Sequence, residues 1–171
     1  MTSVLFRLVF VLAFFSALSA CSMLFPESKN EETLQLHISI QAATNLNPDI
    51  KSRPSPIILR VYELKSDAVF TQADFFSLQD NDKTTLTEDL LARNEFIVRP
   101  GDRFTTRRKA HPQSGVIGMF AAFRDLPHST WRATFRLPPP SDAAWYKKMF
   151  SSNAIRLQVL LEENTIRILE D

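Results

Sequence analysis

Apolar and polar residues alternate in two stretches of the chain after residue 33, which is the pattern of strands with one buried face. Residues 34–41 (LQLHISIQ) alternate without a break, and residues 154–161 (AIRLQVLL) repeat the pattern near the C-terminus. Further strands are predicted at 57–64, 95–99, 103–109, 116–124, 130–137 and 165–170. Because Pro100-Gly101 is a turn dipeptide, we expect 103–109 to pair with 95–99. The chain is therefore predicted to be mainly β, a two-sheet β-sandwich.

Helical spacing replaces the alternation between the second and third predicted strands. Residues 67–79 have apolar side chains at helical intervals, with Ser66 or Asp67 as N-cap, and 87–93 form a further helical turn. A small helical insert at about 66–93 is the prediction. The aromatic residues are abundant and are expected to fill the core; the candidates are Phe75, Phe76, Phe96, Phe120, Phe123 and Phe135, with Trp131 capping one end.

A polar connection, residues 45–56 (NLNPDIKSRPSP), joins the first two predicted strands. It has three prolines and no glycine, and it is longer than two neighbouring strands require. Loops of this length in compact domains are commonly functional, and proline reduces the entropy lost when a loop docks on a partner. A plain long crossover is the alternative interpretation.

The N-terminus reads as a leader for export. Residues 1–20 have one basic residue, Arg7, a short apolar run at 8–15 and then small residues, which is the layout of a secretory signal peptide. An N-terminal anchor helix is the alternative. Residues 18–21 (LSAC) resemble the bacterial lipobox, which implies cleavage after residue 20 and acylation of Cys21, the single cysteine. Residues 22–33 are then a tether, and 34–171 the sandwich domain. Ser22, rather than Asp, resembles the outer-membrane sorting pattern.

Charge and side-chain chemistry exclude several function classes. Without Arg7, the chain has 19 basic and 19 acidic residues, and a neutral, mixed surface argues against nucleic acid and against a polybasic membrane patch. His37, His111 and His128 have no partners at metal-ligand spacing. Ser114 near His111 has no orienting third group. We therefore expect no catalytic residues, no metal, no small-molecule substrate and no cofactor apart from the lipid on Cys21.

Several motifs together resemble the TssJ (SciN) family, the outer-membrane lipoproteins of type VI secretion systems. The resemblance rests on the lipobox and on these residues in order: Asn45, Asn47, Arg53-Pro54-Ser55-Pro56, Val61-Tyr62-Glu63-Leu64-Lys65, Phe70, Ala73-Asp74-Phe75-Phe76-Ser77-Leu78, Pro100-Gly101, Gly115-Val116, Phe123-Arg124-Asp125 and Trp131-Arg132. It implies a transthyretin-like sandwich with a helical insert and a protruding loop between the first two strands.

The resemblance also implies a role, which is binding rather than catalysis. Members lie on the periplasmic face of the outer membrane, held by acyl chains. They bind the periplasmic C-terminal domain of TssM and so join the TssM–TssL membrane complex. The family's contact loop corresponds here to Asn45, Leu46, Asn47, Pro48, Asp49, Ile50, Lys51, Ser52 and Arg53. On this basis, replacing residues 47–53 with a Gly-Ser link is expected to weaken partner binding and leave the thermal midpoint nearly unchanged.

Two other functions stay open from the sequence alone. One is a different lipoprotein adaptor, such as a pilot for an outer-membrane channel, and the other is a periplasmic enzyme or ligand-binding domain with a pocket lined by His111 or His128. The amphipathic residues 145–150 (WYKKMF) fit no motif of the family.

Overall fold

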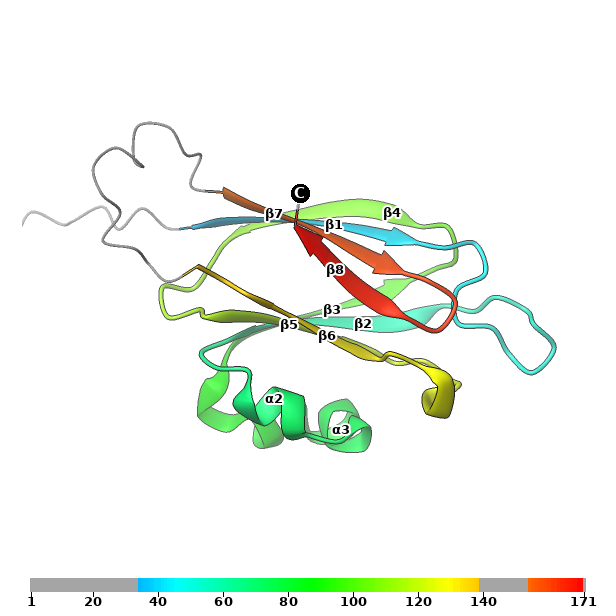
Figure 1. Cartoon of the computed structure of the whole chain (residues 1–171), viewed down its shortest axis with the longest axis horizontal. Helices are drawn as coiled ribbons and strands as arrows, with labels where there is room; N and C mark the ends of the chain where they lie inside the picture. The colour runs from blue at the N-terminus through cyan, green and yellow to red at the C-terminus, as the bar shows by residue number, and fades with distance from the viewer. Residues whose placement is uncertain (1–33, 139–153, 171) are drawn as a thin grey trace, which may run out of the picture. The chain divides into compact units, whose positions relative to one another are not determined.

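A computed structural model describes residues 34–138 and 154–170, and these form two four-stranded sheets packed face to face (Figure 1). Sheet A has the order β4-β1-β7-β8, and sheet B has the order β3-β2-β5-β6. The strands of sheet A are β4 (Arg103–Lys109), β1 (Gln35–Ala42), β7 (Ala154–Leu161) and β8 (Ile166–Glu170). Those of sheet B are β3 (Leu90–Val98), β2 (Ile57–Leu64), β5 (Val116–Ala121) and β6 (Arg132–Arg136). The predicted two-sheet sandwich is confirmed.

The alternation in the sequence places the main core between the sheets. Leu36, Ile38 and Ile40 of β1 are buried, whereas the residues between them are partly exposed. The same period makes Ile155, Leu157 and Val159 of β7 face inward. Since β1 and β7 pair in parallel, with Ile38 opposite Leu157, their apolar positions fall in the same rows. The other pairs of neighbouring strands are antiparallel.

The expected pairing of 103–109 with 95–99 is wrong. β4 pairs with β1 in sheet A, Phe104 opposite Ile40, whereas β3 belongs to sheet B. The Pro100-Gly101 turn therefore carries the chain from one sheet to the other. Gly101 has φ +82° and donates its N–H to the Ala43 carbonyl at 3.1 Å. A local turn signal fixes a reversal of direction but not the sheet that the next strand joins.

The helical insert consists of α2 (Ala68–Gln72), α3 (Phe75–Leu86) and the 3-10 turn η2 (Thr87–Asp89), and it covers the outer face of sheet B (Figure 1). It ends earlier than predicted, because residues 90–93 already belong to β3. The Ser66 hydroxyl accepts the Ala68 N–H at 3.1 Å, and the Asp74 carboxylate caps α3 by accepting the Ser77 N–H at 3.0 Å. A second 3-10 turn, η3 (Leu126–His128), precedes β6.

A second apolar cluster joins the insert to sheet B. It contains Tyr62, Leu64, Phe70, Phe75, Leu78, Leu86, Val116 and Phe120. Phe75 and Trp131 meet edge to face, with ring centroids 5.4 Å apart. Of the predicted core phenylalanines, Phe75, Phe120 and Phe123 are buried and Phe96 and Phe135 pack against the core. Phe76 was predicted wrongly: its side chain is 61% exposed, because only one face of α3 meets the sheet.

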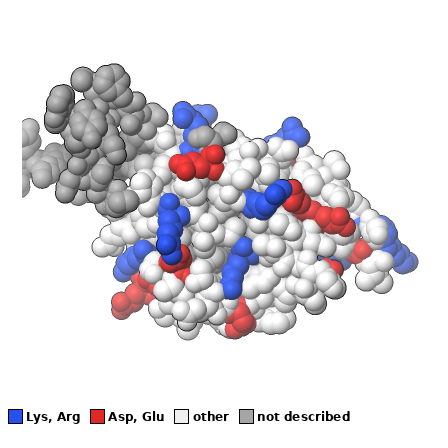
Figure 2. Space-filling model, viewed as in Figure 1, with Lys and Arg blue, Asp and Glu red and all other residues white. Residues whose placement is uncertain are grey.

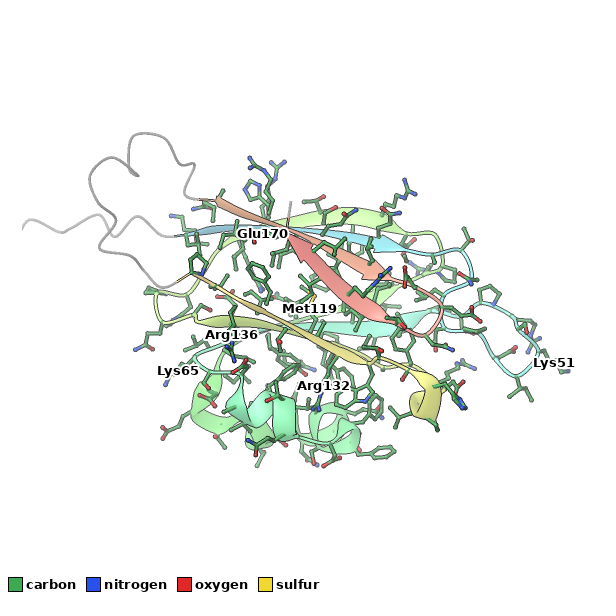
Figure 3. All side chains as sticks on the ribbon, in the orientation of Figure 1. Lys51, Lys65, Met119, Arg132, Arg136 and Glu170 are labelled. Atoms are coloured by element: carbon green, nitrogen blue, oxygen red, sulfur yellow. The ribbon has the colours of Figure 1, made fainter. Side chains whose placement is uncertain are left out.

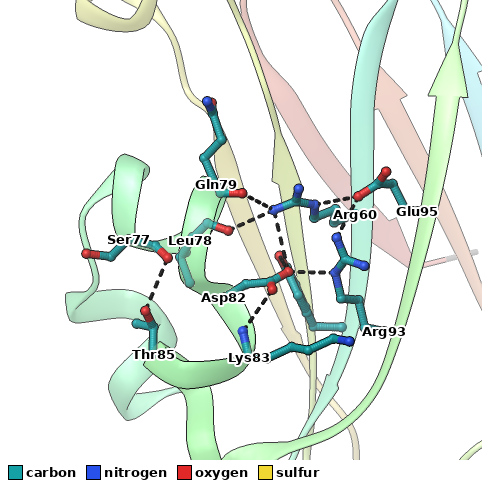
Figure 4. Close-up of polar contacts among 10 residues, drawn as sticks. Arg60, Ser77, Leu78, Gln79, Asp82, Lys83, Thr85, Arg93 and Glu95 are labelled. Atoms are coloured by element: carbon teal, nitrogen blue, oxygen red, sulfur yellow. Dashed lines mark hydrogen bonds and ion pairs between the residues drawn. The ribbon is translucent and has the colours of Figure 1, made fainter.

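Buried charges complete the attachment of the insert (Figure 4). Asp82 of α3 accepts from the Tyr62 hydroxyl at 2.9 Å and from Arg93 Nε at 2.6 Å, and Arg60 Nη1 donates to the Leu78 and Gln79 carbonyls at 2.8 Å. Burial, followed by the bond to Asp82, raises the pKa of Tyr62 to about 12. Removing one member would leave buried polar groups without partners, which is strongly destabilising.

Candidate functional site: the loop between β1 and β2

The β1–β2 loop, residues 43–56, projects beyond the ends of both sheets (Figure 1). Its first residue is hydrogen-bonded to the end of β7 and to the β3–β4 turn. The Ala43 N–H donates to the Leu161 carbonyl at 2.8 Å, and the Ala43 carbonyl accepts from the Gly101 N–H. Leu46 is completely buried in the main core. The loop is therefore anchored at its base by an apolar side chain as well as by backbone hydrogen bonds.

Asn47 holds the two arms of the loop together. Its side-chain Nδ2 donates to the Pro56 carbonyl at 3.0 Å, and its Oδ1 accepts the Arg124 N–H at 2.9 Å. Its own N–H donates to the Glu163 carbonyl at 2.8 Å. The residue is buried and has φ +48°, a left-handed conformation that asparagine tolerates better than most residues. The side chain of Asn47 thus joins the two arms of the loop and ties them to Arg124, and its backbone N–H adds the bond to the β7–β8 turn.

Asp49 organises the tip of the loop. Its Oδ1 accepts the N–H groups of Lys51 at 2.8 Å and Arg53 at 3.0 Å, and its Oδ2 accepts from Arg53 Nε at 2.8 Å. The Ser52 N–H donates to the Asp49 carbonyl at 2.8 Å. The side-chain bond from Arg53, assisted by the backbone bonds, holds the pKa of Asp49 below its usual value. The tip is consequently a closed turn of fixed shape.

The side chains at the end of this turn are exposed to solvent. Ile50 is 101% exposed, and Lys51, Ser52 and Arg53 are exposed beside it. Figure 3 shows Lys51 at the far end of the loop, away from the sheets. An apolar side chain next to two cations, on a backbone that is already ordered, can insert into an apolar depression rimmed by acidic groups at low entropic cost.

The nine predicted contact residues divide into two groups. Leu46 and Asn47 point inward and build the loop, and Asn45 is exposed but donates to the Glu163 carboxylate at 3.2 Å. Pro48 and Asp49 are half-buried. Ile50, Lys51, Ser52 and Arg53 are exposed and form the tip of the loop. The sequence placed the loop correctly, but it could not show that Leu46 belongs to the core.

A buried ion pair between the sheets was missed from the sequence, as were the ion pairs of Asp82. Glu63 on β2 lies between the sheets, with Oε1 3.0 Å from Nε of Arg108 on β4. Its Oε2 accepts the His111 N–H at 2.8 Å and the Ser114 hydroxyl at 3.0 Å. Burial lowers the pKa of Arg108, and Glu63 opposes that shift. This cluster joins the two sheets, and the alternation of β4 alone, which points Arg108 inward, was the signal for it.

The described residues show no constellation for catalysis. His111 and His128 are exposed, and His37 lies on the outward face of β1. No group of three His, Cys, Asp or Glu side chains within residues 34–138 and 154–170 is placed to hold a metal ion. In the same residues, no helix has the length and apolarity needed to cross a membrane. Cys21 and the 145–150 segment lie outside the described residues.

Comparison with known proteins gives a consistent relationship. The family model described as Type VI secretion lipoprotein, VasD, EvfM, TssJ, VC_A0113 matches residues 34–164. The structure of the T6SS lipoprotein TssJ1 from Pseudomonas aeruginosa is 34% identical, with a TM-score of 0.72, and the match covers 81% of this chain and 97% of that chain. The structure of Serratia marcescens Lip, a membrane bound component of the Type VI Secretion System, is 30% identical, with a TM-score of 0.73 and 79% and 96% covered.

A more distant likeness extends to the fold alone. A chain in the structure described as T6SS protein TssM C-terminal domain (869-1107) from EAEC is 21% identical, with a TM-score of 0.59, and 79% of this chain and 97% of that chain are covered. A search of curated proteins finds no significant match to the chain.

Proposed function

This chain belongs to the TssJ family of type VI secretion lipoproteins, and from that premise we propose that it links the outer membrane to the TssM–TssL complex of the inner membrane. The lipid on Cys21 holds one end at the periplasmic face of the outer membrane. The β1–β2 loop binds the periplasmic C-terminal domain of TssM. The family is a structural component of the secretion system and not an enzyme family; we infer that this chain likewise acts mechanically.

The observation that carries the proposal is the geometry of the loop tip. Ile50, Lys51 and Arg53 stand clear of the sandwich, and Asp49 and Asn47 fix the backbone beneath them. Little conformational entropy is lost when such a loop is bound, so ordering the loop subtracts little from the binding free energy. An ordered binding loop on a firmly packed domain suits a protein that holds two membrane-bound components together.

The direct test is titration calorimetry of the mature chain, without its lipid, against the periplasmic C-terminal domain of TssM from the same organism. We expect saturable one-to-one binding. Ile50→Ala is expected to weaken it about tenfold, which corresponds to 1.4 kcal/mol at the centre of a small contact. The matched control is Val69→Ala, because Val69 is an exposed apolar residue on the insert. Equal affinities for the two variants, or no binding by the folded wild-type chain, would refute the assignment of this loop.

The anchor is tested separately. Cys21→Ser is expected to leave the fold intact and to move the protein from the membrane fraction to the soluble periplasmic fraction, since several acyl chains are needed for stable anchoring. Fractionation and a far-ultraviolet dichroism spectrum measure the two effects. Wild-type levels of membrane-bound Cys21→Ser protein would show that something other than the lipid holds it there.

A further inference from the structure

The two outer faces of the sandwich differ in cover. The helical insert lies on sheet B, whereas no helix among the described residues covers the outer face of sheet A (Figure 1). The side chains that point outward from sheet A are Gln35, His37, Ser39, Gln41, Arg103, Thr105, Arg107, Lys109, Ala154, Arg156, Gln158, Leu160, Arg167 and Leu169. This outward set contains five basic residues and, among the described residues, no acidic one.

Four of these cations have no carboxylate partner within the described part of the chain. Arg103, Arg107, Lys109 and Arg156 are exposed, whereas Arg167 pairs with Glu162. Arg107 and Arg156 flank His37 in one row across three strands, and neighbouring strands lie about 4.8 Å apart. Figure 2 views the sandwich from the side; Lys and Arg side chains stand at its upper margin, and an acidic group lies just below the left-hand ones. The neutral net charge predicted a mixed surface, whereas the outward positions of these strands have an excess of basic residues.

The chemistry of this face suits phosphate groups better than a protein surface. Arginine and lysine between short hydroxyl and amide side chains bind phosphate oxygens through charge-assisted hydrogen bonds. Protein interfaces instead have an apolar, aromatic-rich centre, and the only large apolar residues in the outward set are Leu160 and Leu169 on β7 and β8.

The position of this face along the chain favours a membrane as its occupant. The chain belongs to a lipoprotein family, and a dozen residues separate Cys21 from Leu34. These residues span at most about 40 Å, and the strand that follows them, β1, lies inside sheet A. We propose that the outer face of sheet A docks on anionic phospholipid headgroups of the membrane that holds the anchor. The helical insert on the opposite sheet then faces away from that membrane.

The test uses the lipidated full-length mature protein in vesicles. Because Cys21 is the only cysteine and is acylated, Thr105→Cys gives one labelling site on β4, between Arg103 and Arg107, and Thr84→Cys gives the matched control on α3. A nitroxide on each site is exposed to nickel chelated on lipid headgroups, in vesicles of phosphatidylethanolamine with phosphatidylglycerol. We expect strong relaxation at residue 105 and weak relaxation at residue 84.

Removing charge separates docking from simple anchoring. The Arg103→Gln, Arg107→Gln, Arg156→Gln variant is expected to lower the ratio of docked to undocked protein about 100-fold, since each basic residue at an anionic surface contributes about fivefold. High salt is expected to lower the same ratio for the wild-type protein, because it screens the attraction between the basic residues and the anionic headgroups. Equal relaxation at residues 105 and 84 would overturn the proposal. So would strong relaxation at residue 105 that survives charge removal, or strong relaxation that requires an added protein partner.

Discussion

The β1–β2 loop and the helical insert are both long connections to β2, yet different forces hold them. The insert buries Phe70, Leu78 and Leu86 on sheet B and closes over the Asp82 ion pairs. The loop buries one apolar side chain, Leu46, and is otherwise held by the hydrogen bonds of Asn47 and Asp49. The insert therefore contributes to stability by burying apolar side chains, whereas the loop keeps the side chains of its tip exposed to solvent.

This difference explains why the loop is suited to recognition and the insert is not. A loop held by local polar bonds can change its tip without disturbing the core, whereas a segment that fills a core cannot. The tip, residues 50–53, is therefore expected to be separable from stability. Changes in the insert, or at Asn47 at the base of the loop, are expected to lower stability.

The largest expected effect is loss of the insert's packing. Phe70→Ala removes a completely buried ring that lies 5.6 Å from Tyr62, and we expect the free energy of unfolding to fall by about 3–5 kcal/mol. Phe76→Ala, on the exposed side of α3, should cost under about 1 kcal/mol. Urea denaturation measures both. Similar losses for the two variants would mean that the insert is not a second core.

The next largest effect is expected at Asn47, at the base of the β1–β2 loop. Asn47→Ala leaves the Arg124 N–H without its acceptor and places alanine at a positive φ, so we expect a loss of about 2–3 kcal/mol in unfolding free energy. Asn45→Ala is the control, because its exposed bond to Glu163 should cost about 0.5 kcal/mol. TssM affinity should fall with Asn47→Ala as well, since the tip loses its support. An unchanged urea midpoint for Asn47→Ala would show that the loop arms are held by other contacts.

Exchange of the tip alone should separate affinity from stability. Replacing Ile50-Lys51-Ser52 with Gly-Ser-Gly keeps Asn47, Asp49 and Arg53 in place, so we expect less than about 0.5 kcal/mol change in unfolding free energy. TssM binding should weaken at least about tenfold. The wider replacement of residues 47–53 is no longer expected to spare the thermal midpoint, because Asn47 is buried and triply bonded. A clear stability loss from the narrow replacement would make the tip structural.

The smallest effect is a pH response confined to the tip. Arg53 lowers the pKa of Asp49, so the order that this carboxylate confers is complete above the unfolded value of about 3.9 and is lost as pH falls through the folded value. Amide shifts of Lys51 and Arg53, which donate to Asp49, should therefore titrate with a midpoint below 3.9. In Asp49→Asn these shifts should not respond in that range. A wild-type midpoint at or above 3.9 would contradict the ion pair.

Period-2 alternation predicted the strands of sheet A well because that sheet buries only its inner face. In sheet B the insert also covers the outer face, so β5 is buried at every position and β2 along its C-terminal half. β2, β4 and β7 begin and end where the pattern does, and the long polar loop before β2 was recognised from its prolines. The resemblance to TssJ lipoproteins rested on motifs spread over the same domain, and the family match supports it.

Pairing and depth were decided only by the tertiary structure. The sequence around Pro100-Gly101 does not show whether β4 pairs with β3 or with β1, because either pairing requires a turn at this position. Adjacent phenylalanines, Phe75 and Phe76, have equal hydrophobicity, but the helix turns one to the sheet and the other to solvent. The basic face of sheet A likewise arises from strands distant in sequence, which contribute Arg107 and Arg156 to one row. Periodicity along a chain reports which side of each element is buried, whereas the partner on that side is set by long-range packing.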